Sequence, residues 1–171
     1  MPAFLRSVTF AVFALVSAAV SVTAWAQEAQ PASKPILVIS GKISPADHSE
    51  SVQFDRTALE GLGVVAIQTN TPWYKDPVKF EGVSLDKLMQ TVGAKGDRVT
   101  VVALNDYSIE IPMEDFAKYG AILALKRDGE YMTVRDKGPL FIVYPYDQNP
   151  ELKSQKFYSR SAWQVAKIIV K

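Results

Sequence analysis

The chain has 171 residues, with 19 Lys and Arg against 18 Asp and Glu, one histidine and no cysteine. This balanced charge, without a basic run, gives no indication of binding to nucleic acid or to an anionic membrane surface. Without cysteine the chain has neither disulfides nor thiolate ligands, and a transition-metal site would have to be nearly all carboxylate. The single histidine, His48, lies in a polar stretch and is expected on the surface.

The first 26 residues have the pattern of a secretion signal. Arg6 supplies positive charge, residues 8–20 are apolar apart from Ser and Thr, and Ala24-Trp25-Ala26 places small residues where a signal peptidase reads them. Cleavage after Ala26 predicts a periplasmic product. The alternative is an uncleaved membrane anchor, for which the apolar run is short.

Residues 27–34 are rich in Ala, Gln, Pro and Ser and are expected to be a flexible lead-in. Residues 35–171 then form one domain, and at this length a hydrophobic core can hold it together without disulfides.

The first half of this domain predicts two strands and two helices. Short β-branched runs predict strands at 36–39 and 64–67. Asp55 is a good N-cap for a short helix that Gly61 and Gly63 close. The clearest helix spans 83–93, with Ser84 as its cap and Gly93 as its stop. Its apolar face is Leu85, Leu88, Met89 and Val92.

The second half is richer in strands. The almost wholly apolar run 99–104 predicts a strand buried on both faces. Asn105-Asp106 is a turn signal, and Asp128-Gly129 predicts a hairpin. The other elements expected are strands at 107–111, 122–125, 131–134, 140–144 and 163–170, a short helix at 112–119 and a polar loop at 148–155. Strands dominate and no repeat is present, so the fold class is α+β.

Several segments, taken in order, resemble the sulfite-oxidase-type molybdopterin-binding domain. They are Phe80-Glu-Gly-Val-Ser-Leu-Asp-Lys-Leu88, Asn105-Asp-Tyr107, Asp128-Gly129 with Lys137-Gly-Pro-Leu140, and Arg160-Ser-Ala-Trp-Gln-Val165. Together they cover roughly residue 36 to the end of the chain. The resemblance implies a β-rich α+β single domain of the sulfite-oxidase-type molybdopterin-binding fold.

The chain departs from these enzymes at the metal ligand. Their cysteine comes on the segment before the Phe-x-Gly-Val-x-Leu motif, and here that segment is Ile67-Gln-Thr-Asn-Thr-Pro-Trp73. Ser, Thr or Gln cannot provide the soft, anionic thiolate with which these enzymes ligate molybdenum. The chain therefore resembles most closely the small, exported relatives that lack this cysteine.

Some of those relatives bind reduced pterins and report to an inner-membrane regulator of cyclic-di-GMP. The resemblance thus implies a pterin or molybdopterin-like ligand, no metal, and a partner that is the periplasmic domain of an inner-membrane signalling enzyme. It implies binding and signalling in place of catalysis.

A pterin is a flat bicycle with a donor–acceptor edge, which needs stacking surface and polar edge groups. Asp106, beside Asn105, could accept two N–H groups of that edge; the alternative is that both residues only form a hairpin turn. Trp73 and Tyr74, in a polar loop next to Pro72, could stack on the ring or anchor the loop on the sheet.

Three more side chains are candidates near the end of the domain. Arg160 offers a planar fork of donors for a ring carbonyl, with a solvated surface charge as the alternative. Trp163 is expected to pack in the core, with a ligand contact as the alternative. Tyr107 and Tyr158 could each give a hydroxyl to the site or lie as amphipathic residues at the surface.

Three functions from different classes follow. The first is a non-catalytic ligand-binding protein. The second is a molybdopterin-dependent oxidoreductase in which another residue, or none, ligates the metal. The third is an interaction domain whose pocket has decayed. Nucleophilic catalysis finds no support, because His48 has no Ser or Asp placed by a recognisable motif.

Overall fold

The computed structural model describes residues 34–46 and 48–171. The expected signal peptide lies outside these residues, as does the expected lead-in apart from Lys34. Within the described part of the chain, no helix has the length and apolar character needed to cross a membrane.

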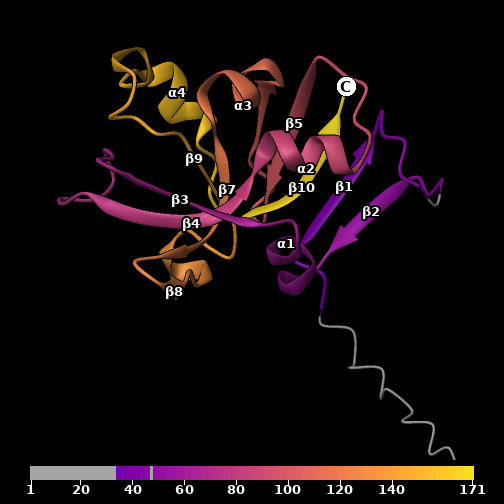
Figure 1. Ribbon diagram of the computed structural model, residues 1–171, viewed down its shortest axis with the longest axis horizontal. Coiled ribbons are helices and arrows are strands. Elements are labelled where there is room, and N and C mark those ends of the chain that lie inside the picture. The colour runs from indigo at the N-terminus through magenta and orange to yellow at the C-terminus, as the bar shows by residue number, and fades with distance from the viewer. Residues whose placement is uncertain (1–33, 47) are drawn as a thin grey trace, which may run out of the picture. The chain divides into compact units, whose positions relative to one another are not determined.

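The described residues build two five-stranded sheets, which lie on opposite sides of the domain in Figure 1. The first sheet has the order β2-β1-β10-β5-β6, and in it only β1 and β10 pair in parallel. Its strands are β1 (Leu37–Gly41), β2 (Ser51–Phe54), β5 (Arg98–Ala103), β6 (Ser108–Pro112) and β10 (Val165–Val170).

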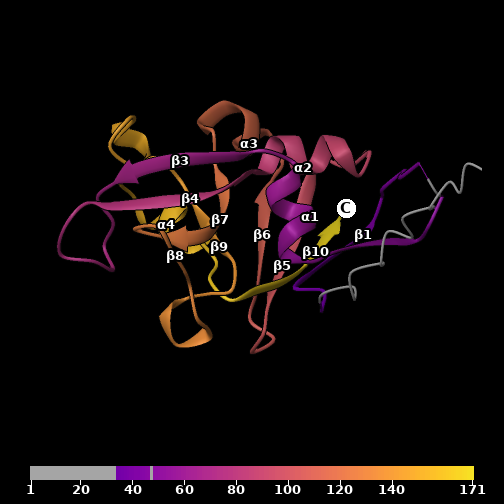
Figure 2. The ribbon, with the colours of Figure 1, turned by 60° about the horizontal axis from the view of Figure 1, so that its bottom comes forward.

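The second sheet has the order β3-β4-β7-β8, and β9 pairs with β7 beside this path. All its pairings are antiparallel. Its strands are β3 (Val64–Thr69), β4 (Val78–Ser84), β7 (Ile122–Arg127), β8 (Glu130–Tyr131) and β9 (Phe141–Val143). The loop between β3 and β4 lies at the same end of the domain as the segment that follows β9 (Figure 2).

The helices are short and lie between strands. They are α1 (Arg56–Gly61), α2 (Leu85–Thr91), α3 (Glu114–Tyr119) and α4 (Gln155–Arg160), with 3-10 turns at Val134–Asp136 and Pro150–Leu152. An isolated helix of six or seven residues is unstable in water, so tertiary contacts must fix each of them in place.

The capping residues predicted from the sequence are confirmed. The Asp55 carboxylate accepts from the Ala58 N–H at 2.7 Å, at the start of α1. Ser84 caps α2, and the predicted apolar face of that helix is buried. Gly120, with φ 67°, ends α3 in the left-handed region. Asp128-Gly129 forms the β7–β8 hairpin turn, although β8 is only two residues long.

Other expectations were wrong. The strand 99–104 was expected to be buried on both faces, but in β5 buried residues alternate with partly exposed ones, because the core covers only one face of this sheet. The closing strand begins at Val165 and not at Trp163, since Gln164 has a left-handed backbone with φ 55°. The predicted polar loop at 148–155 contains a 3-10 turn and runs into α4, which was not predicted.

Strand β4 was not predicted from the sequence. Within it, Gly82 is required because the backbone of β7 lies very close to this position. The β4–β7 register shifts between Glu81 and Gly82. A Cβ at Gly82 would meet the Leu123 carbonyl oxygen and the Ala124 Cα of β7. The neighbouring strand therefore leaves no room for a side chain at this position.

We predict that Gly82→Ala destabilises the protein by about 1–3 kcal/mol, the usual range for overpacking, because β7 backbone has to shift. Thermal unfolding followed by circular dichroism measures this. Gly61→Ala is the matched control, since a Cβ there meets nothing within 4 Å. Equal melting temperatures for the two variants would contradict the proposed close approach.

Candidate functional site

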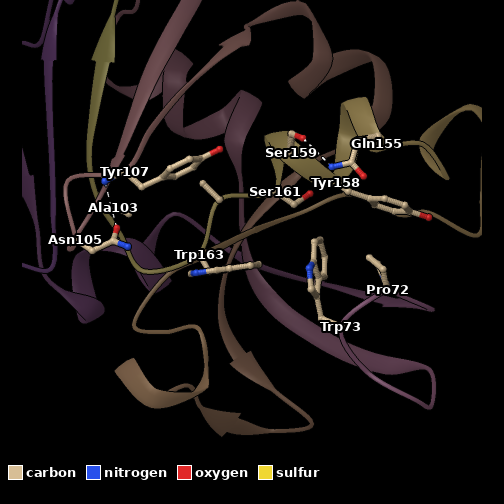
Figure 3. Close-up of a pocket in the computed structure, with 11 residues that line it drawn as sticks. Pro72, Trp73, Ala103, Asn105, Tyr107, Gln155, Tyr158, Ser159, Ser161 and Trp163 are labelled. Atoms are coloured by element: carbon tan, nitrogen blue, oxygen red, sulfur yellow. Dashed lines mark hydrogen bonds between the residues drawn. The ribbon is translucent and has the colours of Figure 1, made fainter.

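A cavity of about 420 Å³ opens where four segments meet: the loop after β3, the β5–β6 turn, α4, and the chain leading into β10 (Figure 3). It is lined by Pro72, Trp73, Ala103, Asn105, Tyr107, Gln155, Tyr158, Ser159, Ser161, Ala162 and Trp163. None of these side chains is charged. The walls therefore offer aromatic surface and neutral hydrogen-bonding groups.

Trp73 is the centre of an aromatic cluster beside the cavity. Its ring meets four others edge to face, with centroid distances of 5.4 Å to Phe141, 6.2 Å to Tyr146, 6.0 Å to Tyr158 and 5.9 Å to Trp163. Figure 3 shows Trp73, Tyr158 and Trp163 around the same hollow. Trp73 thus packs against the core and also lines the cavity, so the two roles considered for it are compatible.

The polar groups of the lining differ in how far the protein already uses them. The Asn105 Oδ1 accepts from the Tyr107 N–H at 3.2 Å, while its amide nitrogen has no acceptor among the described residues. The Ser161 hydroxyl bonds to the Tyr146 hydroxyl and to the Phe157 carbonyl. Asn105 is therefore a free donor in the lining, whereas Ser161 is already satisfied by the protein.

Burial also fixes the state of the tyrosine beneath the cavity. The pKa of the Tyr146 phenol is raised well above its ordinary value, first because burial penalises the phenolate. Tyr146 is therefore a neutral hydroxyl at all ordinary pH values, and its contribution is to hold Ser161 in place.

The structure brings together four of the seven predicted site residues: Trp73, Asn105, Tyr107 and Trp163 all line the cavity. Trp163, expected mainly in the core, is 39% exposed. Tyr107 is also at the surface, with 50% of its area exposed.

The other three predicted residues lie outside the lining. Asp106 is exposed in the β5–β6 turn with φ 63°, as in the simple turn considered for it. Tyr74 packs against Phe80, and its hydroxyl donates to Asp136.

Arg160 is the third of these residues. It is neither a solvated surface charge nor part of the lining, because its guanidinium lies 2.5 Å from the Asp115 carboxylate in a largely buried ion pair.

Sequence reasoning missed Gln155, Ser159 and Ser161. The first two lie one helical turn apart on α4, and the Gln155 amide nitrogen donates to the Ser159 hydroxyl at 3.3 Å. A spacing of i, i+4 brings two side chains together only on a helix, and no helix was predicted for this segment.

Strained backbone gathers around the cavity. Five residues other than glycine have positive φ among the described residues, and three of them, Asp106, Lys137 and Gln164, lie in segments next to the lining. The Gln164 N–H donates to the Lys137 carbonyl, and the Gln164 carbonyl accepts from the Leu104 N–H. These bonds fix the segment that presents Trp163. Such clusters of uncommon backbone conformations are typical of functional sites.

A carboxylate holds the loop that carries Trp73. Asp147 accepts from the Asn70 backbone N–H at 2.6 Å and from the Asn70 amide at 2.9 Å. Its other oxygen lies 2.7 Å from the Lys153 ammonium. Hydrogen bonding to Lys153, and then to Asn70, lowers the pKa of Asp147 to about 2. The end of β3 is thus tied to the segment that leads into α4.

Comparison with known proteins supports the fold. A scan against protein-family models and a search of the curated proteins gave no match. Among solved structures, the sulfane dehydrogenase SoxCD from Paracoccus pantotrophus is similar, with a TM-score of 0.57 and 16% sequence identity over 78% of this chain and 37% of that chain. This likeness confirms the predicted β-rich α+β fold of the sulfite-oxidase type, and at this identity it shows the fold alone.

The residues around the cavity do not fit the metal centre that this fold implies. No cysteine exists in the chain, and the lining contains only amides, hydroxyls, aromatic rings and small apolar side chains. In the described residues no group of three or more His, Asp or Glu side chains could hold a metal ion.

The lowered pKa of Asp147 predicts a pH effect on stability. A carboxyl group with a lowered pKa in the folded state stabilises the fold above its unfolded pKa of about 4, and this contribution is lost as the pH falls towards about 2. We expect Asp147→Asn to be less stable than the wild type at pH 6, with the difference shrinking between about pH 4 and pH 2. Urea unfolding of both proteins across this range measures it.

Asp76→Asn, at an exposed position in the same loop, is the matched control for the loss of one negative charge. A constant difference between Asp147→Asn and the wild type down to pH 2 would show that the Asp147 charge does not hold the loop.

Proposed function

We propose that this protein is an exported, non-catalytic binding protein for a pterin-type ligand, and that it reports the bound state to a membrane signalling partner. The observation that carries the proposal is the uncharged aromatic cavity with the free Asn105 amide at its wall. Cavities of about 300–1,000 Å³ with aromatic walls and a few polar groups are typical small-molecule sites.

The wall chemistry favours a flat heterocycle. Trp73, Tyr158 and Trp163 offer ring surfaces from three separate segments. A pterin ring carries a carbonyl that the Asn105 amide can donate to, and the Ser159 and Gln155 side chains supply further neutral partners. The absence of charge in the lining suits a ligand whose ring is neutral, because an unpaired ion would lose solvation there without compensation.

The same wall chemistry favours binding over catalysis. Neither histidine nor a carboxylate or lysine lines the cavity, so the side chains that most often serve as general acid or base are missing from its walls. A binding site needs only the shape and the hydrogen bonds described above.

The signalling part of the proposal is supported by the resemblance to the exported relatives without cysteine and by apolar surface at the cavity rim. Leu104 and Tyr107, on the β5–β6 turn, are 52% and 50% exposed. A partner that covers this turn would contact the region where the ligand binds. The partner we propose is the periplasmic domain of an inner-membrane enzyme that regulates cyclic-di-GMP.

A pair of substitutions in the β5–β6 turn tests the binding site. Asn105→Asp keeps the side-chain oxygen that accepts from Tyr107 but replaces the amide donor with a carboxylate. We expect it to weaken binding of a reduced pterin by about tenfold or more, because an acceptor then faces the ring carbonyl. Titration followed by tryptophan fluorescence measures this, with melting temperature recorded in parallel.

Asp106→Asn makes the reverse exchange at the next residue and should leave the affinity unchanged, since Asp106 is outside the lining. The opposite result, with weaker pterin binding by Asp106→Asn and unchanged binding by Asn105→Asp, would make Asp106 the group that binds the polar edge of the pterin. It would show that the residues lining this cavity are not those that contact the ligand.

Metal content separates binding from the rival oxidoreductase function. We expect the mature protein purified from the periplasm to contain no stoichiometric molybdenum or tungsten, because no thiolate is present to hold either metal. Elemental analysis by mass spectrometry checks this. About one metal atom per chain would favour the oxidoreductase.

A further inference from the structure

Arg160 and Asp115 form the most buried ion pair among the described residues. The Arg160 Nη1 lies 2.5 Å from the Asp115 Oδ2, and the two side chains are 17% and 4% exposed. Arg160 borders a different, more open cavity of about 740 Å³, together with Glu110 and Glu114. The guanidinium is therefore engaged away from the aromatic cavity.

The Asp115 carboxylate has a second partner. It accepts from the Tyr144 hydroxyl at 3.2 Å, and Tyr144 is fully buried. Burial, followed by the charge of Asp115, raises the pKa of Tyr144, so this hydroxyl stays protonated and donates. A buried charge is tolerated only where its partners are correctly placed. The network therefore specifies one position of Arg160, and with it one position of α4 against α3.

Helix α4 depends on such contacts. It has six residues, and its only buried side chain is Phe157, which packs edge to face at 5.0 Å from Tyr119 and 5.3 Å from Tyr144. The ion pair adds a fixed point at its last residue, directly before Ser161.

The same helix carries one wall of the cavity. Gln155, Tyr158 and Ser159 belong to α4, and Ser161 and Ala162 follow it directly. A shift of α4 would move Tyr158 out of its edge-to-face contact with Trp73, and would move this wall relative to Asn105 and Tyr107 on the β5–β6 turn (Figure 3).

We propose that Arg160 and Asp115 are positioning residues for ligand binding: their buried pair sets the place of α4, and thereby the width of the aromatic cavity, although neither side chain touches the ligand. The binding test of this inference rests on the proposed pterin-type function. It assigns Arg160 a role different from the direct ligand contact predicted from the sequence.

The two roles for Arg160 separate in a double-mutant cycle. We would titrate a reduced pterin into Asp115→Asn, Arg160→Gln and the double variant, at a temperature well below each melting point. Positioning predicts that each single variant binds about tenfold more weakly or worse, and that the double variant is no weaker than the singles. Arg160→Lys keeps the positive charge. It should bind more tightly than Arg160→Gln and perturb folding less.

Arg98→Gln is the matched control, because Arg98 also pairs with acids but at the exposed surface. It should bind as the wild type does. Normal binding by Asp115→Asn with weak binding by Arg160→Gln would mean that Arg160 contacts the ligand, and would overturn the proposal. A merely structural role is also excluded by this design, since it would lower the melting temperature and leave the affinity below that temperature unchanged.

A second readout needs no ligand. Lys156 lies within α4 and is exposed, so trypsin cleavage after it reports how firmly the helix is held. We expect faster cleavage at Lys156 in Asp115→Asn than in the wild type or Arg98→Gln. Unchanged cleavage would overturn the positioning role. If the wild type binds no reduced pterin while cleavage still accelerates, the proposed ligand is wrong but the pair is shown to hold α4.

Discussion

The edge-to-face packing of Trp73 is the interaction on which the candidate site depends. Its four aromatic neighbours come from β9, the chain after β9, α4 and the segment leading into β10. Aromatic pairs in this arrangement gain about 0.5–1.5 kcal/mol each beyond the burial of their area. The cluster therefore joins segments far apart in the sequence at the place where the cavity opens.

Polar interactions then fix the outer parts of this arrangement. Asp147 ties the loop of Trp73 to the chain before α4, and the Asp115–Arg160 pair ties the end of α4 to α3. The walls of the cavity are thus held in place by the protein itself, which reduces the ordering cost of binding a ligand. A solved dehydrogenase has a similar fold, but chemistry depends on the groups inside a cavity, and here the lining side chains are neutral.

The sequence predicted those parts of the fold that local chemistry determines. Asp55 and Ser84 are typical helix N-caps and predicted the starts of α1 and α2, and Asp128-Gly129 predicted the hairpin turn between β7 and β8. Trp73 and Asn105 were predicted as site residues because both lie in polar loops beside strands, and both line the cavity. The same reasoning selected Tyr74 and Asp106, which lie outside the lining.

The rest depends on contacts between distant residues. Helix α4 buries only Phe157, so it has no apolar periodicity to read. Arg160 and Asp115 are 45 residues apart, and nothing in the local sequence of either indicates the other. The one-sided burial of β5 likewise depends on which face the core covers, which a run of apolar residues does not encode.

Native mass spectrometry of the protein purified from the periplasm tests the central claim most directly. We expect the mass of residues 27–171 with one additional small molecule, which denaturation releases and which has the mass and absorption of a pterin. A bare chain mass that stays unchanged after addition of excess reduced pterin would contradict it.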